Sequence, residues 1–240
     1  MIVKTRGIVL STLRYSDSSV IVRIYTEIAG LRSFMVRTGK GKTALLRMSL
    51  LQPLGPVEIS FDRDEKKNLH VPRSLERDAI LKEIPFDTAK TCIALFMAEV
   101  VSHSIAEEEM NSKLFEFLHG SVMLLDAETN SVKNFHLKFM IEFSGHLGFF
   151  PHQRIEDEAF FDLFEGMFVT HEPLHRHYLQ GALVSFFEEL MNAPFKQHHQ
   201  VRIGNENRRQ LLQALVDYYR LHLHGMKEIN AHKVLEEVLG

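Results

Sequence analysis

The spacing of apolar residues changes near Pro85 and divides the sequence into two parts. Before this proline, short runs such as residues 20–25 and 31–36 are rich in β-branched and aromatic residues, which is typical of strands. After it, apolar residues recur at every third or fourth position, as in residues 93–101 and 114–125, which is typical of helices. We therefore expect an α+β protein in which a strand-rich part precedes a helical part.

The strand-rich part has the size of a small β-barrel. Strands are expected at residues 2–10, 20–25, 31–36, 49–61 and 68–79. Pro53 and Pro56 indicate that the fourth strand is bulged or lies at a sheet edge. Five short strands in about 80 residues are typical of an OB-fold barrel, although the pattern also fits other small barrels.

The helical part is expected to begin just after Pro85, where Asp87 can cap the first helix. Further helical periodicity is present at residues 134–148, 183–191, 211–223 and 234–239. The predicted organisation is multidomain, with an N-terminal OB-fold β-barrel over residues 1–80 and an all-α helical domain over residues 81–240.

Charge is distributed unevenly between these two parts. Residues 1–80 contain 14 lysines and arginines against 8 acidic residues, a net charge of +6, whereas residues 81–240 carry a net charge of −9. Such asymmetry indicates a basic module that binds a polyanion, attached to an acidic body with another role. Chance fluctuation of charge is the alternative, but the basic excess coincides with the change in periodicity.

Cysteine content and hydropathy bear on the cellular compartment. Cys92 is the single cysteine, so an internal disulfide framework and a cysteine-based zinc site are both excluded. No run approaches the roughly 18 apolar residues of a membrane span, and the N-terminus lacks the apolar core of a signal peptide. We expect a cytoplasmic protein without membrane association.

A glycine- and lysine-rich segment, Gly39-Lys40-Gly41-Lys42-Thr43, resembles the end of a phosphate-binding P-loop. That motif requires a further glycine at position 36, which is Val36 inside an expected strand. A basic loop that contacts phosphate oxygens through lysines and backbone N–H groups explains the same residues better.

Two other patterns invite a catalytic interpretation. His171-Glu172-Pro173-Leu174-His175 has the spacing of a zinc peptidase motif, but that motif needs a continuous helix, which Pro173 interrupts. With His177 the histidines form a surface cluster that could bind a metal weakly. Cys92 lies among apolar residues and has no evident partner base, as is typical of an inert core thiol. We expect no enzyme activity, cofactor or metal site.

Basic and aromatic residues alternate in the N-terminal part. The basic residues of the first 50 positions are Lys4, Arg6, Arg14, Arg23, Arg32, Arg37, Lys40, Lys42 and Arg47. Such side chains neutralise phosphates, and aromatic rings between them can stack on unpaired bases. Tyr15, beside Arg14 in an expected turn, is the better stacking candidate, whereas Phe34 is expected to be buried. The sequence does not assign Tyr25 to the core or to a stacking surface.

The order of several motifs resembles the RecO family over almost the whole chain. The motifs are Gly7-Ile8-Val9-Leu10, Tyr15-Ser16-Asp17-Ser18-Ser19, Ile24-Tyr25-Thr26, Val36-Arg37-Thr38-Gly39-Lys40-Gly41-Lys42, Leu51-Gln52-Pro53-Leu54, Leu147-Gly148-Phe149-Phe150-Pro151 and Tyr218-Tyr219-Arg220-Leu221-His222-Leu223. Many family members carry a four-cysteine zinc site after the leucine-glycine-x-x-proline segment. This chain has phenylalanines and histidines there, so we expect aromatic packing in place of a metal.

The resemblance implies a recombinational DNA repair mediator. Such proteins bind single- and double-stranded DNA through the OB barrel and anneal complementary strands without a covalent step. They bind the C-terminal tail of single-stranded DNA-binding protein through the helical domain and, with RecR, help to load RecA. Carried over by position, the DNA-binding residues would be Arg14, Tyr15, Arg37, Lys40, Lys42 and Arg47. Basic residues that could rim the tail pocket are Lys133, Lys138, Arg208 and Arg209.

Two alternatives remain open. The barrel could instead bind protein within an interaction scaffold, which would show no salt-sensitive affinity for DNA. A metal-dependent hydrolase built on the histidine cluster would hold stoichiometric zinc and lose activity on His175→Ala. The residues do not distinguish RNA from DNA as the ligand, because OB barrels bind both.

Overall fold

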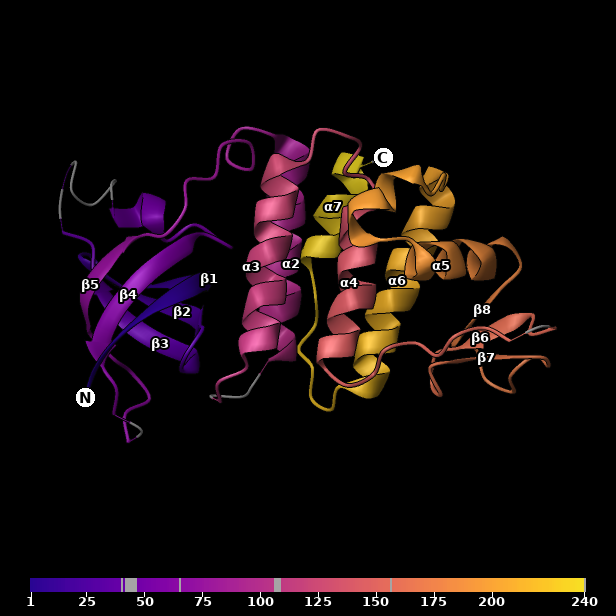
Figure 1. Cartoon of the computed structure of the whole chain (residues 1–240), viewed down its shortest axis with the longest axis horizontal. Helices are drawn as coiled ribbons and strands as arrows, with labels where there is room; N and C mark the ends of the chain where they lie inside the picture. The colour runs from indigo at the N-terminus through magenta and orange to yellow at the C-terminus, as the bar shows by residue number, and fades with distance from the viewer. Residues whose placement is uncertain (40, 42–46, 65, 106–108, 156, 240) are drawn as a thin grey trace. The chain divides into compact units, whose positions relative to one another are not determined.

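A computed structural model describes residues 1–240 except for positions 40, 42–46, 65, 106–108, 156 and 240 (Figure 1). The chain forms two compact units, Met1–Ala127 and Glu128–Gly240. We call them the first and second unit and describe each by itself. The predicted domain boundary at residue 80 stays a prediction.

The first unit is built on a five-stranded antiparallel sheet. Its strands are β1 (Ile2–Ser16), β2 (Ser19–Thr26), β3 (Gly30–Arg37), β4 (Pro56–Asp62) and β5 (Pro72–Arg77). Their order in the sheet is β3-β2-β1-β4-β5. Alternate residues of β2, β3 and β4 point inward, so the apolar positions of each strand meet in one core around Val22, Phe34 and Ile59.

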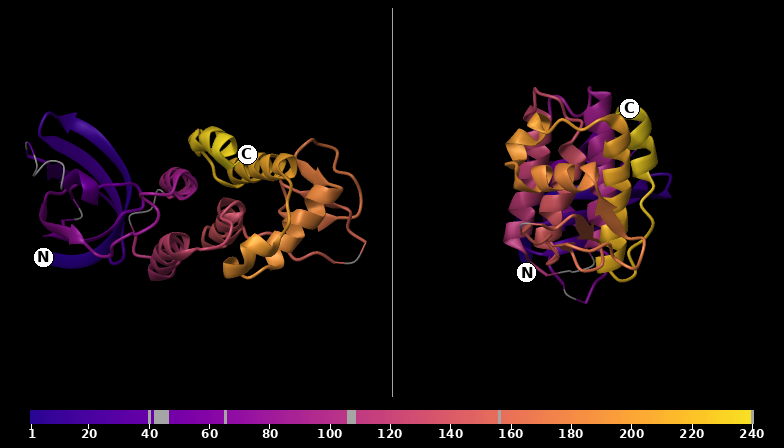
Figure 2. Two further views of the ribbon diagram at one scale, coloured as in Figure 1. Left: turned by 90° about the horizontal axis from the view of Figure 1, so that it is seen from above. Right: turned by 90° about the vertical axis from the view of Figure 1, so that its right-hand side faces the viewer.

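The sheet curves so that its two edges approach one another, as the view from above shows (Figure 2). His70, just before β5, forms a parallel bridge with Phe34 of β3, and its backbone exchanges hydrogen bonds with Ser33 and Met35 at 2.9 and 2.8 Å. The His70 ring also packs against Phe34 and Phe61. The barrel is not closed by a full ladder, but the strand order is compatible with an OB fold, and the expected α+β class is confirmed.

Two strand boundaries differ from the sequence prediction. The first strand continues to Ser16 instead of ending near residue 10, so Tyr15 lies in a strand and not in a turn. Residues 47–50 are helical and 51–54 form a turn, where a strand was expected from residue 49. The apolar run there is too short for its period to distinguish helix from strand, and Pro53 cannot donate to a sheet ladder.

Two helices complete the first unit, α2 (Thr88–Ser104) and α3 (Ser112–Ala127). Asp87 caps α2 as predicted, since its side chain accepts a hydrogen bond from Lys90 N at 2.9 Å. At the end of α3, the Asp126 carboxylate accepts three backbone N–H groups, those of Lys82, Glu83 and Ile84, at 2.8–2.9 Å. This carboxylate therefore fixes the segment that leads from the sheet to α2.

The second unit is mainly helical. It contains α4 (Phe135–His146), α5 (Ala182–Asn192), the 3-10 helix η1 (Phe195–Gln200), α6 (Asn205–His222) and α7 (Ala231–Leu239). Helix α4 lies in the centre and contacts α5, α6 and η1. The side chains of α4 from Phe135 to Ile141 are all buried, which explains why its apolar residues occur on every face.

The second unit also contains a small three-stranded sheet that the sequence analysis did not predict. Its strands are β6 (Phe160–Asp162), β7 (Met167–Val169) and β8 (Tyr178–Gln180), in the order β7-β6-β8. Phe161 packs against Phe168 and against Phe187 of α5, with ring centroids 4.9 and 4.5 Å apart. Aromatic packing therefore holds the segment in which the family resemblance would place a zinc site.

Candidate nucleic-acid interface

The β1–β2 hairpin extends beyond the barrel core. All four residues from 13 to 16 are exposed, whereas a strand that covers a core buries alternate residues. Leu13 and Tyr15 keep 67% and 62% of their surfaces exposed, although both are large and largely apolar. Leu13 was not among the predicted site residues, since nothing in the sequence shows that an aliphatic side chain at this position is exposed. The hairpin end is therefore a surface available to a ligand.

Three of the predicted arginines meet at this end of the sheet. Ser16 pairs with Ser19, and Ser19 pairs in turn with Arg37 on β3. Since neighbouring strands lie about 4.8 Å apart, the Arg37 backbone is about 10 Å from the end of β1. Arg47 donates from Nη1 to the Arg37 carbonyl oxygen at 2.5 Å, and Arg14 lies two positions before Ser16. The structure thus places Arg14, Arg37 and Arg47 at the same end of the sheet, with Arg47 bonded to Arg37.

These arginines are exposed and engaged only weakly by the protein itself. The Arg14 side chain is 77% exposed, and it pairs at 3.1 Å with Asp17, whose side chain is 98% exposed. Such surface pairs contribute at most about 1 kcal/mol, so a phosphate can compete for the guanidinium. Arg37 and Arg47 are likewise exposed.

The loop after β3 begins with two glycines in left-handed backbone conformations. Gly39 and Gly41 have φ angles of 81° and 64°, which favour glycine because a side chain would be strained there. A Cβ added at Gly41 would have no neighbour within 4 Å, so the requirement comes from the backbone and not from crowding. Lys40 and Lys42, both predicted to bind DNA, lie outside the described residues.

The aromatic residues of the basic part separate into two groups. Phe34 and Tyr25 keep 0% and 1% of their surfaces exposed, so the prediction that Phe34 is buried is confirmed and neither ring can stack on a base. Tyr15 is the exposed ring of the three. It is the neighbour of Arg14 in β1, so an exposed ring and an exposed guanidinium come from successive positions of the strand.

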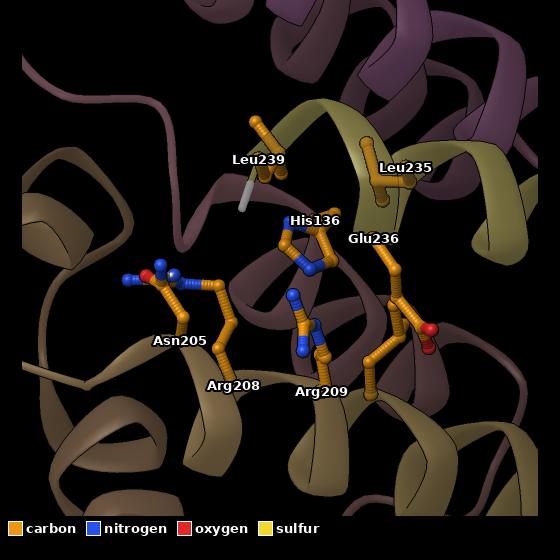
Figure 3. A pocket seen from close by; sticks show the side chains of 8 residues that line it. His136, Asn205, Arg208, Arg209, Leu235, Glu236 and Leu239 are labelled. Carbon is orange, nitrogen blue, oxygen red and sulfur yellow. Dashed lines mark hydrogen bonds between the residues drawn. The ribbon is translucent and has the colours of Figure 1, made fainter.

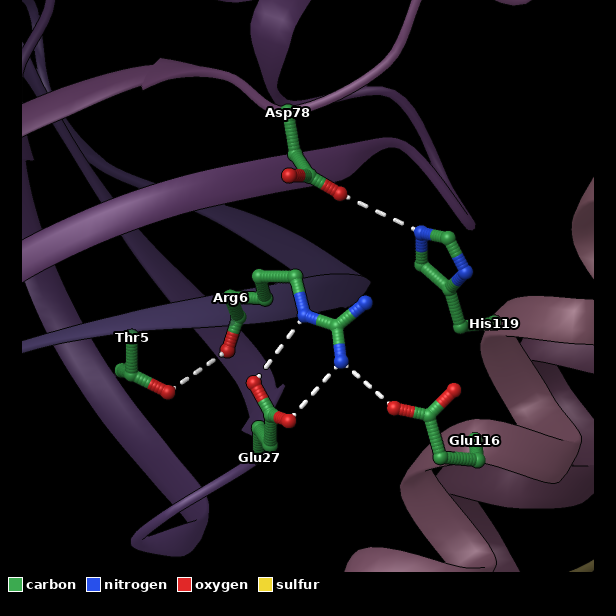
Figure 4. A network of polar contacts seen from close by, with 6 residues as sticks. All are labelled: Thr5, Arg6, Glu27, Asp78, Glu116 and His119. Carbon is green, nitrogen blue, oxygen red and sulfur yellow. Dashed lines mark hydrogen bonds and ion pairs between the residues drawn. The ribbon is translucent and has the colours of Figure 1, made fainter.

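Other basic residues of the barrel are used inside the first unit. Arg6 donates to both carboxylate oxygens of Glu27, at 3.0 and 2.8 Å, and to Glu116 of α3 at 2.5 Å (Figure 4). Its guanidinium also lies over the Phe115 ring. These contacts raise the pKa of Arg6, first through the hydrogen bond to Glu27. Arg6 therefore joins the sheet to α3 and is not part of the exposed group.

Three more basic side chains are also held by contacts within the first unit or buried in it. Arg23 donates from Nη1 to Ser102 Oγ of α2 at 3.1 Å, and Lys4 pairs with Glu58 at 2.6 Å on the neighbouring strand. Arg32 is buried, with 6% of its surface exposed. The basic excess of the N-terminal part is thus divided between internal contacts and the hairpin end.

The patterns with a catalytic appearance do not form the sites they resemble. Val36, where a P-loop needs glycine, is buried in β3. The segment 171–175 is not helical; His175 instead approaches Asp162 Oδ2 at 3.1 Å. Burial raises the pKa of the Cys92 thiol, which disfavours the reactive thiolate.

In the second unit, two of the proposed rim residues are interior. Lys138 is 1% exposed, and its Nζ bonds Met191 O at 3.0 Å and Glu142 at 2.5 Å. Arg208 is 7% exposed and binds Asn134, Asn205 and Ile203. The prediction of an exposed rim is wrong for both, because each cation satisfies backbone and side-chain oxygens that sequence spacing does not reveal. Lys133 and Arg209 are exposed as expected.

Two hollows adjoin Arg208. One lies between α6 and α7, where Leu235, Leu239 and the buried His136 face Arg208 and Arg209 (Figure 3). Burial lowers the pKa of His136 to about 3, so this ring is neutral at pH 7. The other, of about 350 Å³, is lined by Lys133, Arg202 and Arg208 around Val201 and Ile203. Arg202 is exposed and was missed by the sequence analysis, since no periodic segment includes it.

Within the part of the chain that the structure describes, none of the helices is both long enough and apolar enough to cross a membrane. The observed combination is a five-stranded, OB-compatible sheet followed by a helical region, with exposed arginines at one end of the sheet.

Comparison with known proteins identifies the family in which such a sheet is followed by a helical region. The family model described as "Recombination protein O N terminal" matches residues 1–76, and "Recombination protein O C terminal" matches residues 85–228. A DNA repair protein RecO from Phocaeicola vulgatus is 34% identical over the full length of both chains. Those from Bacteroides fragilis and Flavobacterium psychrophilum are 35% and 32% identical over 99% and 100% of both chains.

These matches define a class of DNA repair and recombination proteins. The chain belongs to the RecO family. The motif resemblance in the sequence is therefore confirmed at the level of the family.

Proposed function

We propose that this protein is a non-catalytic mediator of recombinational DNA repair that acts in the cytoplasm. It binds single- and double-stranded DNA through the hairpin end of the barrel and anneals complementary strands. With RecR it helps to load RecA onto DNA coated by single-stranded DNA-binding protein. The observation that carries the DNA-binding step is that exposed Arg14, Tyr15, Arg37 and Arg47 all lie at one end of the sheet. Lys40 and Lys42 add two positive charges between Arg37 and Arg47 in the sequence.

Annealing follows from charge neutralisation. Two complementary strands repel one another through their phosphates, and a surface that neutralises several phosphates lowers this repulsion. Tyr15 can stack on an unpaired base without regard to its identity, so the surface suits many sequences. No covalent bond needs to form or break in this step.

The test is fluorescence anisotropy of a labelled single-stranded oligonucleotide, titrated over a salt series. Arg14→Ala/Arg37→Ala/Arg47→Ala should bind more weakly, and the slope of log affinity against log salt should become shallower by about 2, because three phosphate contacts are lost. Annealing of two complementary oligonucleotides should slow in parallel. Unchanged affinity and slope would overturn the proposed DNA-binding surface.

A matched control removes the same charge elsewhere on the sheet. Lys66, Lys67 and Arg73 lie near the end of β4, which pairs with the start of β1. Along β1 this position is roughly 40 Å from Arg14, at about 3.3 Å per residue. Lys66→Ala/Lys67→Ala/Arg73→Ala should leave the salt slope unchanged. Equal losses in both triple variants would instead indicate attraction by net charge alone and overturn the hairpin end as the DNA-binding surface.

For the tail of single-stranded DNA-binding protein, we propose the 350 Å³ hollow of the second unit. An acidic and apolar peptide needs cations around an apolar floor, and here Lys133 and Arg202 surround buried Val201 and Ile203. Lys133→Ala/Arg202→Ala should weaken binding of a labelled acidic-apolar peptide about 5- to 30-fold, at roughly 0.5–1 kcal/mol for each cation. Arg220→Ala/Lys233→Ala, which removes two exposed cations outside this hollow, should not.

A further inference from the structure

We propose that Glu128, His198 and His199 form a metal site in the second unit, with Zn²⁺ as its preferred ion. No metal site is expected from the sequence, where the cysteine content and the histidines at 171–177 were the features tested for metal binding. The proposed site lies elsewhere, where the residue that follows α3 meets the 3-10 helix η1.

The geometry places three ligand atoms together. One atom from each residue lies within 4.8 Å of the others, and among the described residues no other group of three His, Cys, Asp or Glu side chains does so. Glu128 Oε2 is 3.5 Å from His198 Nε2. Two ligands of a tetrahedral zinc, each about 2.1 Å from the ion, are about 3.4 Å apart, so this pair already has the required separation.

A second observation points to a missing partner. His198 is fully buried, and neither of its ring nitrogens makes a hydrogen bond with the described residues. Nδ1 of His199 is also buried without one. Buried polar atoms almost always have partners, and leaving one unsatisfied costs about 1–3 kcal/mol. A metal ion bound between the two rings would satisfy a nitrogen on each.

The protein holds these residues in place without the ion. Asn134 donates from Nδ2 to the carbonyl oxygens of His198 and Val201, at 3.1 and 2.7 Å, which fixes the end of η1. Asn130 donates its backbone and side-chain N–H groups to Glu128 Oε1, so that Oε2 faces His198. The His198 ring packs between Phe135 and Phe195.

The chemical nature of the three ligand atoms favours zinc over other divalent ions. Two imidazole nitrogens and one carboxylate oxygen are a frequent set for Zn²⁺, whereas Mg²⁺ and Ca²⁺ need six or more oxygens. His199 lines the 350 Å³ hollow, which gives an ion a path to the site and leaves room for water as a fourth ligand. The bound ion would join Glu128, the first residue of the second unit, to η1, although the ligands lie 70 residues apart in the sequence.

The experiment uses the full-length protein, stripped with a chelator and dialysed, then titrated with Zn²⁺ against a chromophoric competitor. We expect one equivalent to bind, with a rise in Tm of about 5–10 °C at 100 times Kd. Substituting Co²⁺ should give the intense visible absorption of a tetrahedral N/O site. Absence of stoichiometric binding would overturn the proposal and indicate buried water instead.

Variants locate the ion. His199→Gln and Glu128→Gln each remove one ligand at positions where the side chain's size is kept, and each should weaken Zn²⁺ binding at least about 10-fold while the far-UV circular dichroism stays unchanged. The matched control is His171→Ala/His177→Ala, which removes two surface histidines and should retain full binding. Zinc that is lost in the control and kept in His199→Gln would overturn the proposed site in favour of the surface cluster.

Discussion

In the first unit Arg14 and Arg37 extend from the sheet into solvent, whereas in the second unit Lys138 and Arg208 lie in the interior and bond to oxygens of the protein. These two pairs of cations therefore differ in where their charge is directed, toward solvent in the first pair and toward oxygens of the protein itself in the second. The net charges of +6 for residues 1–80 and −9 for residues 81–240, whose boundary differs from that of the units, do not reveal this difference. It depends on whether each cation has oxygen partners within its own unit.

The largest expected effect separates two neighbouring arginines of α6. Arg208→Ala removes hydrogen bonds to Asn134 Oδ1 and Ile203 O in a buried place, so we expect a loss of about 2–5 kcal/mol in the free energy of unfolding. Arg209→Ala, at the exposed neighbouring position, should change it by less than about 0.5 kcal/mol. Urea unfolding measures both, and equal losses would contradict the division between interior and surface cations.

A second prediction concerns a buried anion of the first unit. Asp126→Asn weakens three hydrogen bonds from the backbone of residues 82–84, so we expect a loss of about 1–3 kcal/mol at pH 7. Burial raises the pKa of Asp126, but these hydrogen bonds outweigh it, and the net pKa lies below 3.8. Because the folded pKa is the lower one, the stabilisation is complete above the unfolded value and is lost as pH falls through the folded value.

The advantage of wild type over Asp126→Asn should therefore be constant above about pH 5 and shrink below about pH 4. Urea unfolding at several pH values measures it. Asp17→Asn, at a side chain that is 98% exposed, is the control and should be neutral across the same range. A difference between wild type and Asp126→Asn that grew on acidification would contradict the assigned sign.

Sequence predicted the features that depend on local signals. The change of period at Pro85, the Asp87 cap and the burial of Phe34 each follow from residues within a few positions. The sheet β6–β8 could not be found in this way, because strands of three residues are too short to show a period of two. The burial of Arg208 was equally hidden, since its partner Asn134 lies 74 residues away.

The candidate site was predicted in part. Arg14, Tyr15 and Arg37 could be named from composition, but their location at one end of the sheet depends on the hairpin register, in which Ser16 pairs with Ser19 and Ser19 with Arg37. The same register explains why Arg6 does not belong to the exposed candidate site, since it places Arg6 beside Glu27. If the hairpin register had been assigned from the position of the turn, the sequence alone would have distinguished the arginines at the hairpin end from Arg6, which pairs within the unit.

A third prediction sharpens the contrast between exposed and buried rings in the barrel. Tyr15→Ala should weaken binding of single-stranded DNA by roughly 1–3 kcal/mol, because one base loses its stacking partner. The free energy of unfolding should hardly change, since the ring is 62% exposed. Tyr15→Phe keeps the stacking surface and should bind as wild type does. Anisotropy measures the affinities; full affinity in Tyr15→Ala would remove this residue from the site.

The smallest expected effect distinguishes the two groups of arginines within one sheet. Arg6→Ala removes the contacts to Glu27, Glu116 and the Phe115 ring, so we expect the free energy of unfolding to fall by about 1 kcal/mol, discounted because the Arg6 side chain is 34% exposed. The salt slope for single-stranded DNA should not change. Arg37→Ala should do the opposite, with stability kept and the slope shallower by about 0.7. A change in the salt slope with Arg6→Ala would mean that internal ion pairs do not withhold an arginine from DNA, and net charge would then explain binding better than position does.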